Sequence, residues 1–570
     1  MFEKKPWLEF YGHTPKTIDY PRVTLYEALM QTVEQFPDRT AYDFLDYEVT
    51  YRQFAGQIDT FANALAALGM KKGDRITVAM PTCPQGIICF YAANKLGVVA
   101  SMIHPLSTAK EIEFYINVSK STAALTLTEH FDKFNEVKDA TPLKTIILTG
   151  LKDEIPGSAT LELPGPSEGL RIEGWKGLMN GSHPAVPKAR MGTDEMAAIL
   201  YSGGTTGHPK GIMLSNYNFI TEGIAAFSFR APSQGDEDEV VIMVAGLPIF
   251  HGFGLGICCN AVFMNGGTSL LIPVFTPDIL ADIIIRKRPT NISGVPTLYD
   301  ALTRSPVFQS ADLSCLRSTT VGADTLPRTV KERFEETVTR QGGTVQLLEG
   351  YGLTEAVTGI MVTPIDKYRE RSVGVPYPDM LAKVVGIGTQ EEVPPGEEGE
   401  LCLNGPPVML GYLDQPEETA KTLQKHADGR IWLHTGDIFT MDEDGYFYFK
   451  LRLKRMIKSS GMNVYPAQVE AVLYNHADVR DACVIGVPDE TQVQRVKAFV
   501  VLKDNSKAGP DEAKALIDHC RENLIKWSCP REVEFRESLP LTRVGKVAYT
   551  ELEKDEINQL RLQGKFTGGK

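Results

Sequence analysis

The chain lacks the features that mark membrane and secreted proteins. It has no run of about 18 uncharged apolar residues, because the best candidate, GIICFYAANKLGVVASMI from Gly86, is interrupted by Asn94 and Lys95. The first residues, MFEKKPWLEF, carry charges and a proline in place of the apolar core of a secretory signal. The nine cysteines show no CxxC spacing, which indicates neither a disulfide framework nor a zinc site. A cytoplasmic location is expected.

Positive charge is also scarce. The 570 residues include 59 Lys and Arg against 72 Asp and Glu, which gives a net charge of −13. Nucleic-acid binding normally requires a basic face, so a small-molecule partner and no nucleic acid are expected. The length and the 43% apolar residues suffice for several packed cores. One large domain and at least one smaller domain are therefore expected.

Helix-like and strand-like segments alternate along much of the chain. Residues 25–36 and 52–69 have helical periodicity, and the apolar run 74–81 is typical of a strand. KTIILTG, RPTNISGVP and LRSTTVGA repeat the pattern of a short buried strand near Gly or Pro. This alternation predicts parallel sheets with ligands at the carboxyl ends of the strands.

The pattern changes around Val384. Turn residues then recur every few positions between alternating strands, which predicts a more antiparallel, barrel-like portion. DACVIGVPD, VKAFVVL and a helix over 510–524 predict a last compact unit. The predicted fold class is α/β: a large N-terminal domain of stacked α/β subdomains with a β-barrel-like subdomain, then a small mobile α+β C-terminal domain.

The stretch YSGGTTGHPKG, residues 201–211, has little side-chain bulk and many backbone N–H groups. It is not a Walker A loop, because His208 and Pro209 separate Gly207 from Lys210. Glycine-rich turns nevertheless bind anions, and two hydroxyls beside one ammonium suit a triphosphate with its metal. The alternative for such glycines is a tight hairpin between strands.

The order of residues in this loop resembles the signature of the AMP-forming acyl-adenylate superfamily. That superfamily comprises acyl-CoA synthetases, peptide-synthetase adenylation domains and firefly-type luciferases. Six further motifs of the family follow in order, and they are LPIFHGFG (247–254), VGADTLP (321–327), EGYGLTEA (349–356), LHTGD (433–437), LRLKRMIKSSGMNVYPAQVE (451–470) and LTRVGK (541–546). The chain is identified by this resemblance as a member, most like the medium- or long-chain fatty acyl-CoA synthetases.

EGYGLTEA combines an aromatic ring between glycines with a hydroxyl and a carboxylate. The ring suits stacking on a flat base, and a carboxylate in an anionic phosphate pocket makes sense when Mg²⁺ lies between them. The resemblance implies that Tyr351 stacks on adenine, that Thr354 contacts the α-phosphate and that Glu355 binds the metal with Thr205. The alternative for this motif alone is a core tyrosine beside a solvated turn.

The resemblance also implies that Asp437 and Arg452 contact the ribose. A carboxylate such as that of Asp437 can accept hydrogen bonds from both hydroxyls of a diol. The full set of residues assigned to ATP and AMP binding is Ser202, Gly203, Gly204, Thr205, Thr206, Lys210, Gly322, Ala323, Asp324, Glu349, Gly350, Tyr351, Gly352, Thr354, Asp437 and Arg452.

Lys546 in LTRVGK matches the mobile catalytic lysine of the family. A carboxylate that attacks the α-phosphorus brings two anions together, and a lysine between them offsets the repulsion. Glu355, Thr354 and Lys458 are the other residues to which the resemblance assigns catalysis.

The resemblance implies two half-reactions in one cleft. A domain rotation about a hinge at Lys454 withdraws Lys546 and brings up the loop at Lys458, whose small residues leave a tunnel for coenzyme A. The tunnel residues are Ser459, Ser460 and Gly461. The expected domains are 1–451, which holds the ATP and acyl sites, a hinge at 452–455, and a C-terminal lid at 456–570.

A few positions depart from the family pattern. Leu451 stands where Gly or Asp is usual before the hinge, and Arg455 stands where an acidic residue is usual after it. Val493-Gln494 replace a usual Gly-Glu, and Tyr549 stands three residues after the catalytic lysine, where an arginine is common. These departures concern the hinge and the second half-reaction and leave the ATP site unchanged.

The acyl site is expected at LPIFHGFG and GVPTLY, which place His251, Phe253, Val295 and Pro296 around an apolar wall. No aspartate is there to pair with an α-amino group, so an amino acid is not expected. A medium- or long-chain fatty acid is favoured, and an aryl or alicyclic acid is the alternative. For His251 the alternative is a core histidine.

The expected activity is that of an acid-thiol ligase with ATP, Mg²⁺ and coenzyme A. Free coenzyme A is the favoured acceptor because no carrier domain follows LTRVGK, and a separate acyl-carrier protein is the alternative. A catalytically weak nucleotide or acyl-AMP sensor and a luciferase-like oxygenase are remote alternatives. The sequence leaves the choice between a monomer and a homodimer open.

Overall fold

The structure, a computed structural model, describes residues 2–12, 14–202, 209–229, 240–459, 462–489, 493–542 and 547–562. Within these ranges, the side chains that are not described are those of Lys454, Lys458, Met462, Asn463 and Val493. The chain divides into two compact units. The first unit comprises 1–382, 403–434 and 444–446, and the second comprises 383–402, 435–443 and 447–570. The predicted boundaries at residues 451 and 455 stay predictions.

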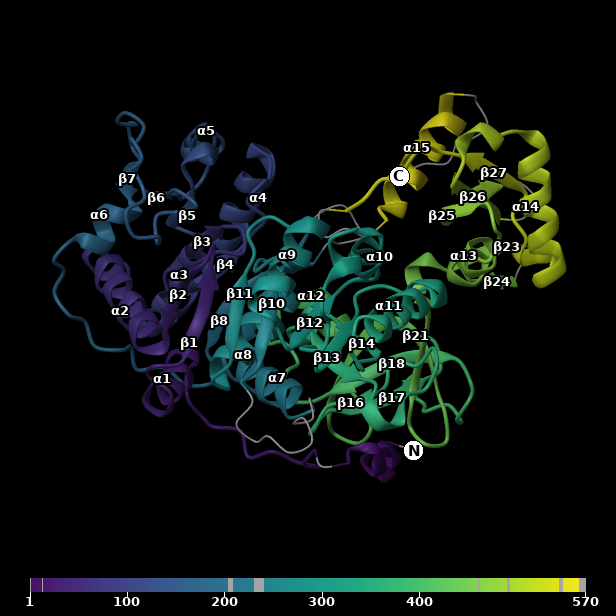
Figure 1. The fold of residues 1–570 in the computed structure, drawn as a ribbon, viewed down its shortest axis with the longest axis horizontal. Helices are drawn as coiled ribbons and strands as arrows, with labels where there is room; N and C mark the ends of the chain where they lie inside the picture. Colours follow the sequence, from purple (N-terminus) through teal and green to yellow (C-terminus); the bar gives the residue numbers. More distant parts are fainter. Residues whose placement is uncertain are drawn as a thin grey trace. The chain divides into compact units, whose positions relative to one another are not determined.

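Two large, largely parallel sheets form the framework of the first unit (Figure 1). The nine-stranded sheet has the order β16-β15-β14-β13-β12-β10-β11-β1-β2. Its strands are β1 (Thr40–Phe44), β2 (Tyr47–Thr50), β10 (Ile242–Ala245), β11 (Thr268–Leu271), β12 (Asn291–Gly294), β13 (Ser318–Val321), β14 (Leu347–Gly352), β15 (Gly359–Val362) and β16 (Val375–Pro376). The expected parallel sheet is confirmed for the six consecutive strands from β14 to β1, which pair in parallel with one another. The outer pairs β1–β2, β14–β15 and β15–β16 are antiparallel.

The eight-stranded sheet of this unit has the order β19-β9-β8-β4-β3-β5-β6-β7. Its strands are β3 (Arg75–Ala79), β4 (Val99–Met102), β5 (Ala123–Leu127), β6 (Thr145–Thr149), β7 (Arg171–Gly174), β8 (Met196–Ser202), β9 (Lys210–Ser215) and β19 (Gly411–Tyr412). Only β8–β9 and β9–β19 are antiparallel among its pairs. The glycine-rich segment therefore joins the two strands of an antiparallel hairpin, in which Ser202 pairs with Lys210.

Several helices of the first unit begin at a capping box, in which the N-cap side chain and the residue three positions later satisfy each other's backbone N–H groups. These helices are α1 (Leu25–Gln35) after Thr24, α2 (Tyr51–Ala67) after Thr50, α4 (Ala109–Ser119) after Thr108 and α7 (Asn216–Ser228) after Ser215. The two helices predicted from periodicity at 25–36 and 52–69 are confirmed as α1 and α2.

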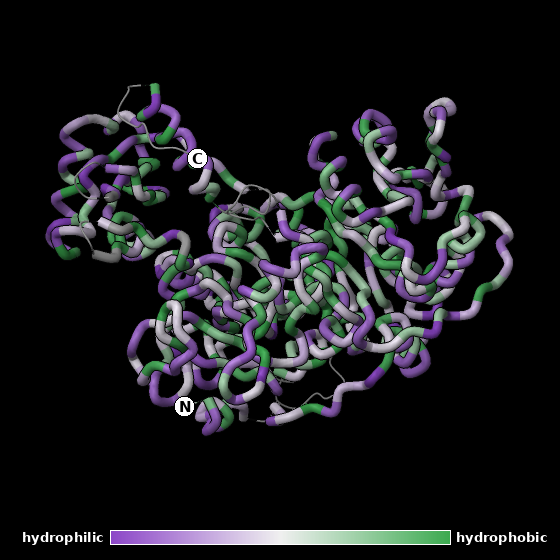
Figure 2. The backbone as a smooth tube through the Cα atoms, turned by 180° about the vertical axis from the view of Figure 1, so that it is seen from behind, coloured by the Kyte–Doolittle hydropathy of each residue, from purple (hydrophilic) through white to green (hydrophobic). Residues whose placement is uncertain are grey.

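Apolar helix faces cover the sheets. The helices α9 (Pro277–Lys287), α10 (Pro296–Arg304) and α11 (Arg328–Arg340) share one core with strands of the nine-stranded sheet (Figure 1). The helices α4 and α5 (Phe131–Glu136) share another core with strands of the eight-stranded sheet. Figure 2 shows hydrophobic residues concentrated in the interior of this unit. The remaining helices are α6 (Trp175–Asn180), α8 (Ala261–Met264) and α12 (Pro416–Thr422).

The apolar run from Gly86 is divided between a core helix and strand β4. The helix is α3 (Pro84–Leu96), every residue of which is buried, and it ends at Gly97 in the left-handed conformation. Lys95, the charge that interrupts the run, pairs with Asp59 at 2.8 Å. In the described part of the chain, no helix combines the length and the apolar run that crossing a membrane requires.

A five-stranded, largely antiparallel sheet follows, with the order β17-β18-β21-β20 and with β22 paired to β21. Its strands are β17 (Leu381–Val385), β18 (Gly399–Asn404), β20 (Leu423–Lys425), β21 (Ile431–Met441) and β22 (Phe447–Arg452). The antiparallel texture predicted after Val384 is confirmed in the pairs β20–β21 and β21–β22.

The C-terminal part of the second unit is one sheet with helices on both faces. Its order is β24-β23-β26-β25, with β27 paired to β26. The elements are β23 (Ile457–Ser459), β24 (Met462–Val464), α13 (Pro466–Tyr474), β25 (Val479–Asp489), β26 (Val493–Leu502), α14 (Pro510–Asn523), β27 (Glu532–Phe535) and α15 (Tyr549–Leu562). The predicted small α+β domain is confirmed.

The two faces of this sheet follow from the two-residue period of a strand. Along β25, Ala482 and Val484 enter the core that α13 and α14 complete, whereas Cys483 and Ile485 enter the core that α15 completes. Both faces are buried, which explains why DACVIGVPD is continuously apolar rather than alternating.

A buried ammonium fastens α15 to this sheet. Lys497 of β26 is 2% exposed, and its Nζ lies 2.7 Å from Glu556 of α15 and 2.8 and 2.9 Å from Glu532 and Glu534 of β27. Burial alone would lower the pKa of Lys497, but the carboxylates outweigh burial and raise it. The lysine therefore stays charged, and it neutralises carboxylates from two elements.

Replacing this lysine tests the cluster. Lys497→Met leaves Glu556, which is 6% exposed, without its closest cation, so we expect the second unit to lose about 3–5 kcal/mol of unfolding free energy. Calorimetric unfolding of the full chain measures the loss, and exposed Lys514→Met is the control. The double variant Lys497→Met with Glu556→Leu should recover part of the loss, because it removes both charges. A single variant that unfolds like the wild type would contradict this account.

Candidate functional site

Three neighbouring parallel strands end at one edge of the nine-stranded sheet, and the predicted motifs follow these ends. Gly294 of β12 pairs with Val321 of β13, and Val321 pairs with Glu349 of β14. Gly322 continues the contact past the strand end by donating its N–H to the carbonyl oxygen of Gly294 at 3.1 Å. The structure thus brings together the expected acyl wall at 295–296, the expected ATP- and AMP-binding segment at 322–324 and the EGYGLTEA motif.

Phe253 approaches the same edge from another segment. A Cβ on Gly322 would lie 3.2 Å from the carbonyl oxygen of Gly350 and 3.8 Å from Cε1 of Phe253. Phe253 opens the π-helical turn η5 (Phe253–Asn260), whose residues from Gly254 onward are buried. A ring predicted for the acyl site is therefore next to a segment predicted for the nucleotide.

The remaining residues of the strand-end motifs differ in exposure. Tyr351, Glu355 and Ala323 are half-buried, Thr354 is buried, and Asp324 is exposed with its carboxylate accepting the N–H of Thr325 at 2.8 Å. Val295 and Pro296 form the start of α10, with Val295 as its N-cap.

Val357 is a strained residue that sequence reasoning missed. It follows the short turn η7 (Thr354–Ala356) with φ 65° and ψ −69°. The N–H of Thr358 donates to the carbonyl oxygen of Ala356 at 2.8 Å, which completes a γ-turn centred on Val357. Such a conformation costs a β-branched residue about 1–3 kcal/mol and persists where the surroundings enforce it.

The enforcing contact comes from the HGFG segment. A Cβ on Gly252 would overlap the carbonyl oxygen of Val357, so only glycine fits there. His251 precedes this glycine, is half-buried, and accepts the N–H of Phe253 on Nδ1 at 3.2 Å. The acyl-site motif is therefore docked directly on the residue two positions after Glu355.

A chain of polar contacts joins the two expected ATP motifs of the first unit. Lys210 Nζ lies 2.7 Å from Glu418 Oε2 and 4.5 Å from the ring centroid of Tyr412. The hydroxyl of Tyr412 donates to Glu355 Oε1 at 2.9 Å. The predicted phosphate lysine and the predicted metal carboxylate are thus linked through one aromatic side chain.

Tyr412 and Glu418 were not predicted from the sequence. Tyr412 forms β19 with Gly411 and pairs with Ile212 of β9, which places it against the hairpin that carries Lys210. Contact with Lys210 lowers the pKa of Glu418 to about 2, and burial together with Glu355 raises that of Tyr412. Both residues lie in the stretch LGYLDQPEE, whose sequence does not indicate a site. Their role appears only once β19 pairs with β9.

Glu349 has an unusual environment for a carboxylate. Burial raises its pKa to about 7, although Lys331 and the hydroxyl of Tyr368 act in the opposite direction. The hydroxyl of Tyr368 donates to Glu349 Oε1 at 3.3 Å. Near neutral pH this side chain is therefore divided between its charged and neutral forms.

The two expected ribose contacts lie together in the second unit. Asp437 of β21 pairs with Arg452 of β22, and Arg452 Nε is 3.3 Å from Asp437 Oδ1. Asp437 is 1% exposed and follows Gly436, whose φ of 69° requires glycine at this turn. The structure therefore brings the predicted carboxylate and arginine into one ion pair.

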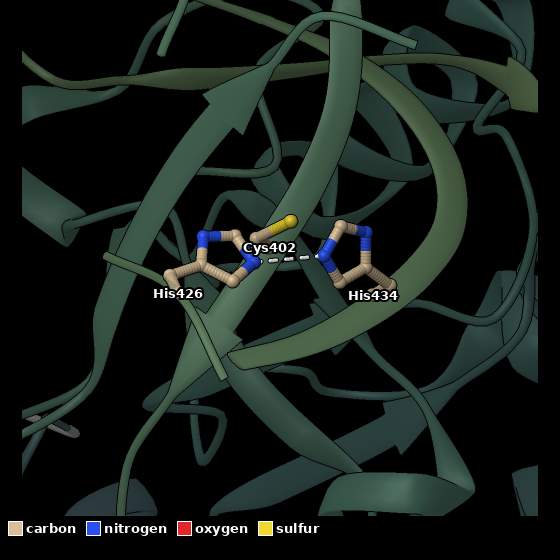
Figure 3. Close-up of side chains that lie close together, drawn as sticks. All are labelled: Cys402, His426 and His434. Atoms are coloured by element: carbon tan, nitrogen blue, oxygen red, sulfur yellow. Dashed lines mark hydrogen bonds between the residues drawn. The ribbon is translucent and has the colours of Figure 1, made fainter. Parts of the chain in front are cut away.

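A histidine pair precedes this turn. Nε2 of His426 and Nε2 of His434 are 2.9 Å apart, so one ring donates and the other accepts. Figure 3 shows the two rings facing each other across this bond; Cys402, also drawn there, belongs to the second unit. The pair holds β21 just before Thr435, the first residue of the TGD sequence.

The expected hinge and tunnel residues are only partly described. Lys454 lies in the turn η9 (Leu453–Arg455), Lys458 lies in β23, and Ser459 is buried with its backbone paired to Met462 and Val493. The predicted site residues outside the described ranges are Gly203, Gly204, Thr205, Thr206, Ser460, Gly461 and Lys546. Their roles stay predictions.

Two groups of described side chains offer oxygen donors for a divalent cation. Glu355 is half-buried, and Tyr412 orients one of its oxygens. His476, Asp478 and Glu512 gather ligand atoms within 4.8 Å of one another in the second unit. There, Lys507 Nζ lies 2.5 Å from Asp478 Oδ1 and already supplies the positive charge. The first of the two is therefore the better position for a cation.

Comparison with known proteins shows which family the sequence matches. The sequence model of the AMP-binding enzyme family matches residues 29–413, and that of the AMP-binding enzyme C-terminal domain matches residues 468–546. A long-chain-fatty-acid–CoA ligase of Bacillus subtilis (strain 168) is 35% identical over 579 residues, covering 99% of this chain and 100% of that protein.

Two further similarities extend the comparison. A feruloyl-CoA synthase of Amycolatopsis sp is 31% identical over 519 residues, covering 91% of this chain and 96% of that protein. The crystal structure of ATP-bound MatB from Rhodopseudomonas palustris superimposes with a TM-score of 0.81 at 24% identity, covering 94% of this chain and 99% of that one. The latter similarity establishes the fold.

The raised pKa of Glu349 predicts that the free energy of unfolding depends on pH. The folded state holds its proton up to about pH 7 and the unfolded state only to about 4.5, so stability falls as pH rises through this window. Glu349→Gln removes the charge, and we expect it to be more stable than the wild type by on the order of 1–3 kcal/mol at pH 8 and equal at pH 4. Thermal unfolding at both pH values measures the difference, with exposed Glu336→Gln as control. A constant difference across pH would refute the assignment.

Proposed function

Because the chain belongs to the AMP-binding enzyme family, we propose that it is an ATP-dependent carboxylic acid–CoA ligase. A carboxylate oxygen of the acid attacks the α-phosphorus of ATP, the bond to the bridging oxygen breaks, and acyl-AMP and pyrophosphate form. The thiolate of coenzyme A then attacks the acyl carbon, and AMP leaves. The observation that carries the proposal is the meeting of the expected acyl wall and the expected nucleotide motif at one sheet edge.

The charges of this edge suit the first half-reaction. Lys210 begins β9 beside the hairpin segment expected to hold the phosphates, and Tyr412 connects it to Glu355. We assign base stacking to Tyr351, α-phosphate contact to Thr354 and ribose binding to Asp437 with Arg452. Lys546 is proposed to bridge the attacking carboxylate and the α-phosphate, where a cation offsets the charge that develops.

Glu355 fits Mg²⁺ by its chemistry, because this cation prefers carboxylate and hydroxyl oxygens. Thr205, the other proposed ligand, lies outside the described residues. When bound, Mg²⁺ neutralises phosphate charge and aligns the pyrophosphate leaving group. Tyr412 contributes by holding the Glu355 carboxylate through a charge-assisted hydrogen bond of 2.9 Å.

A long-chain fatty acid is the proposed substrate class. The turn η5 after Phe253 buries Leu255, Ile257 and Cys258, so the segment behind the proposed acyl site is apolar. The long-chain ligase relative supports an aliphatic acid. An aryl acid is the second candidate, favoured by the feruloyl-CoA synthase relative. Free coenzyme A is proposed as the acceptor, with an acyl-carrier protein as the alternative.

Pyrophosphate release tests this proposal directly. The full chain is incubated with Mg·ATP and acids from acetate to palmitate, together with benzoate, ferulate and cyclohexanecarboxylate, with and without coenzyme A. We expect an acid-dependent burst that becomes sustained turnover only with coenzyme A, and the fastest turnover with long-chain acids. Lys546→Ala should lose adenylate formation by about a hundredfold or more while it retains ATP binding. Release without any dependence on acid, or an unaffected Lys546→Ala, would overturn the proposal.

The Tyr412 contact gives a second test. Tyr412→Phe keeps the ring beside Lys210 but removes the hydrogen bond to Glu355, so we expect about a tenfold higher Mg²⁺ concentration for half-maximal pyrophosphate release. Titration with Mg²⁺ at saturating ATP and acid measures the shift. Tyr26→Phe is a matched control, because the hydroxyl of Tyr26 donates to Asp59 at 2.9 Å, also a tyrosine–carboxylate pair. Equal shifts in both variants would rule out a specific role for Tyr412.

A further inference from the structure

Arg455 joins the expected hinge to three elements of the second unit. Its Nη2 lies 2.6 Å from Glu470 Oε1 of α13 and donates to the carbonyl oxygen of Val484 in β25 at 3.4 Å. Its Cζ lies 4.6 Å from the ring centroid of Tyr549, the first residue of α15. One guanidinium thus contacts a helix on one face of the sheet, the sheet itself and a helix on the other face.

The partners of this arginine are themselves fixed. The carboxylate of Glu470 is 15% exposed and also accepts the backbone N–H of Val484 at 2.8 Å. Burial alone would lower the pKa of Arg455, but Glu470 raises it, so the guanidinium stays charged. This half-buried ion pair and the hydrogen bond to Val484 fix the guanidinium against the ring of Tyr549.

Tyr549 lies at the base of the segment that contains Lys546. Leu541 and Val547 form an antiparallel bridge, and Ala548 donates its N–H to the carbonyl oxygen of Pro540 at 2.8 Å. Tyr549 is the next residue, and its side chain packs against the core between β25, β26 and α15. The Tyr549 ring is thus anchored two residues after the bridged Val547, and Lys546 immediately precedes Val547 in the sequence.

The contact unites two departures from the family pattern. The resemblance to the adenylate-forming family implies an acidic residue at position 455 and an arginine at position 549, whereas this chain has Arg455 and Tyr549. The structure shows that the two exchanged side chains meet, with a cation over an aromatic ring. The two positions at which this chain departs from the resemblance are therefore in direct contact.

We infer that Arg455 and Tyr549 are a pair of positioning residues that set the stem of the segment carrying Lys546 for adenylate formation. The inference rests on the proposed function. It assigns no chemistry to either side chain; each acts through the placement of Lys546. Because Lys546 is expected to withdraw before the thioester step, the pair matters for the first half-reaction and much less for the second.

The test measures the two half-reactions separately on the full chain. Acid-dependent exchange of pyrophosphate into ATP reports the first, and thioester formation from synthetic acyl-AMP and coenzyme A reports the second. We expect Tyr549→Leu to lower the exchange rate by about tenfold, with an unchanged KM for ATP and a thioester rate within about twofold of the wild type. Tyr549→Phe keeps the ring face and should retain most of the exchange rate.

Variants that change the charge at positions 455 and 549, singly and together, test whether the two residues act as a pair. Arg455→Asp alone and Tyr549→Arg alone should each reduce exchange by about tenfold, because the first places two carboxylates together and the second two cations. The double variant restores the opposite charges usual in the family and should recover to within about threefold of the wild type. Arg480→Ala is the control, since Arg480 lies in the same sheet, is exposed, and donates to the carbonyl oxygen of Glu537 at 2.9 Å.

The outcomes separate the inference from the proposed function. If the variants lose equal activity in both half-reactions and melt at a lower temperature, the pair only stabilises the fold, and the inference is overturned. It is also overturned if the exchange rate of the double variant is no higher than the product of the two single-variant effects predicts. A wild-type protein without acid-dependent exchange would overturn the proposed function, and the positioning role with it. If the wild type shows acid-dependent exchange and the variants exchange at the same rate, the positioning role alone is overturned.

Discussion

The close approach of two backbones at Val357 is the constraint on which the candidate site depends. Gly252 and Gly352 both lie where a Cβ would overlap a carbonyl oxygen, of Val357 and of Thr358 respectively. With these two glycines, the HGFG segment and β14 can pack against the same turn, and Val357 is held in a conformation that a β-branched residue rarely adopts. Glu355 lies two residues before Val357, so backbone packing fixes its main chain, and Tyr412 then orients its carboxylate.

The same packing explains why the polar contacts beyond Glu355 are ordered. Tyr412 bridges Glu355, which follows the nine-stranded sheet, and Lys210, which begins a strand of the eight-stranded sheet. A single side chain therefore relates the ends of two sheets that have separate cores. Glu418 completes this arrangement by holding the lysine at 2.7 Å from the other side. Electrostatic preorganisation of this kind is useful to catalysis because the charges are already placed before substrate arrives.

The sequence predicts the framework well, because hydrophobic periodicity and helix capping act locally. The helix expected over 510–524 is α14 (Pro510–Asn523), and the strand DACVIGVPD lies within β25. Motif residues such as Tyr351 and Phe253 are predictable as members of a site because their motifs are contiguous. Tyr412 is not, because its role appears only when β19 pairs with β9. The strain at Val357 is invisible for a related reason: it arises from Gly252, a residue about a hundred positions away.

The departures at Arg455 and Tyr549 show what one-dimensional comparison with a family pattern misses. In the structure the two residues form one contact, with the guanidinium of Arg455 over the ring of Tyr549. The consequence concerns α15 as a whole. Arg455 contacts the first residue of α15, and Lys497 holds Glu556 in its middle at 2.7 Å, so one half-buried and one buried cation fix the helix that follows the LTRVGK segment. Because partly or fully buried pairs are screened by salt less than exposed ones, the contacts of Arg455 and Lys497 hold α15 on the sheet over a wide range of ionic strength.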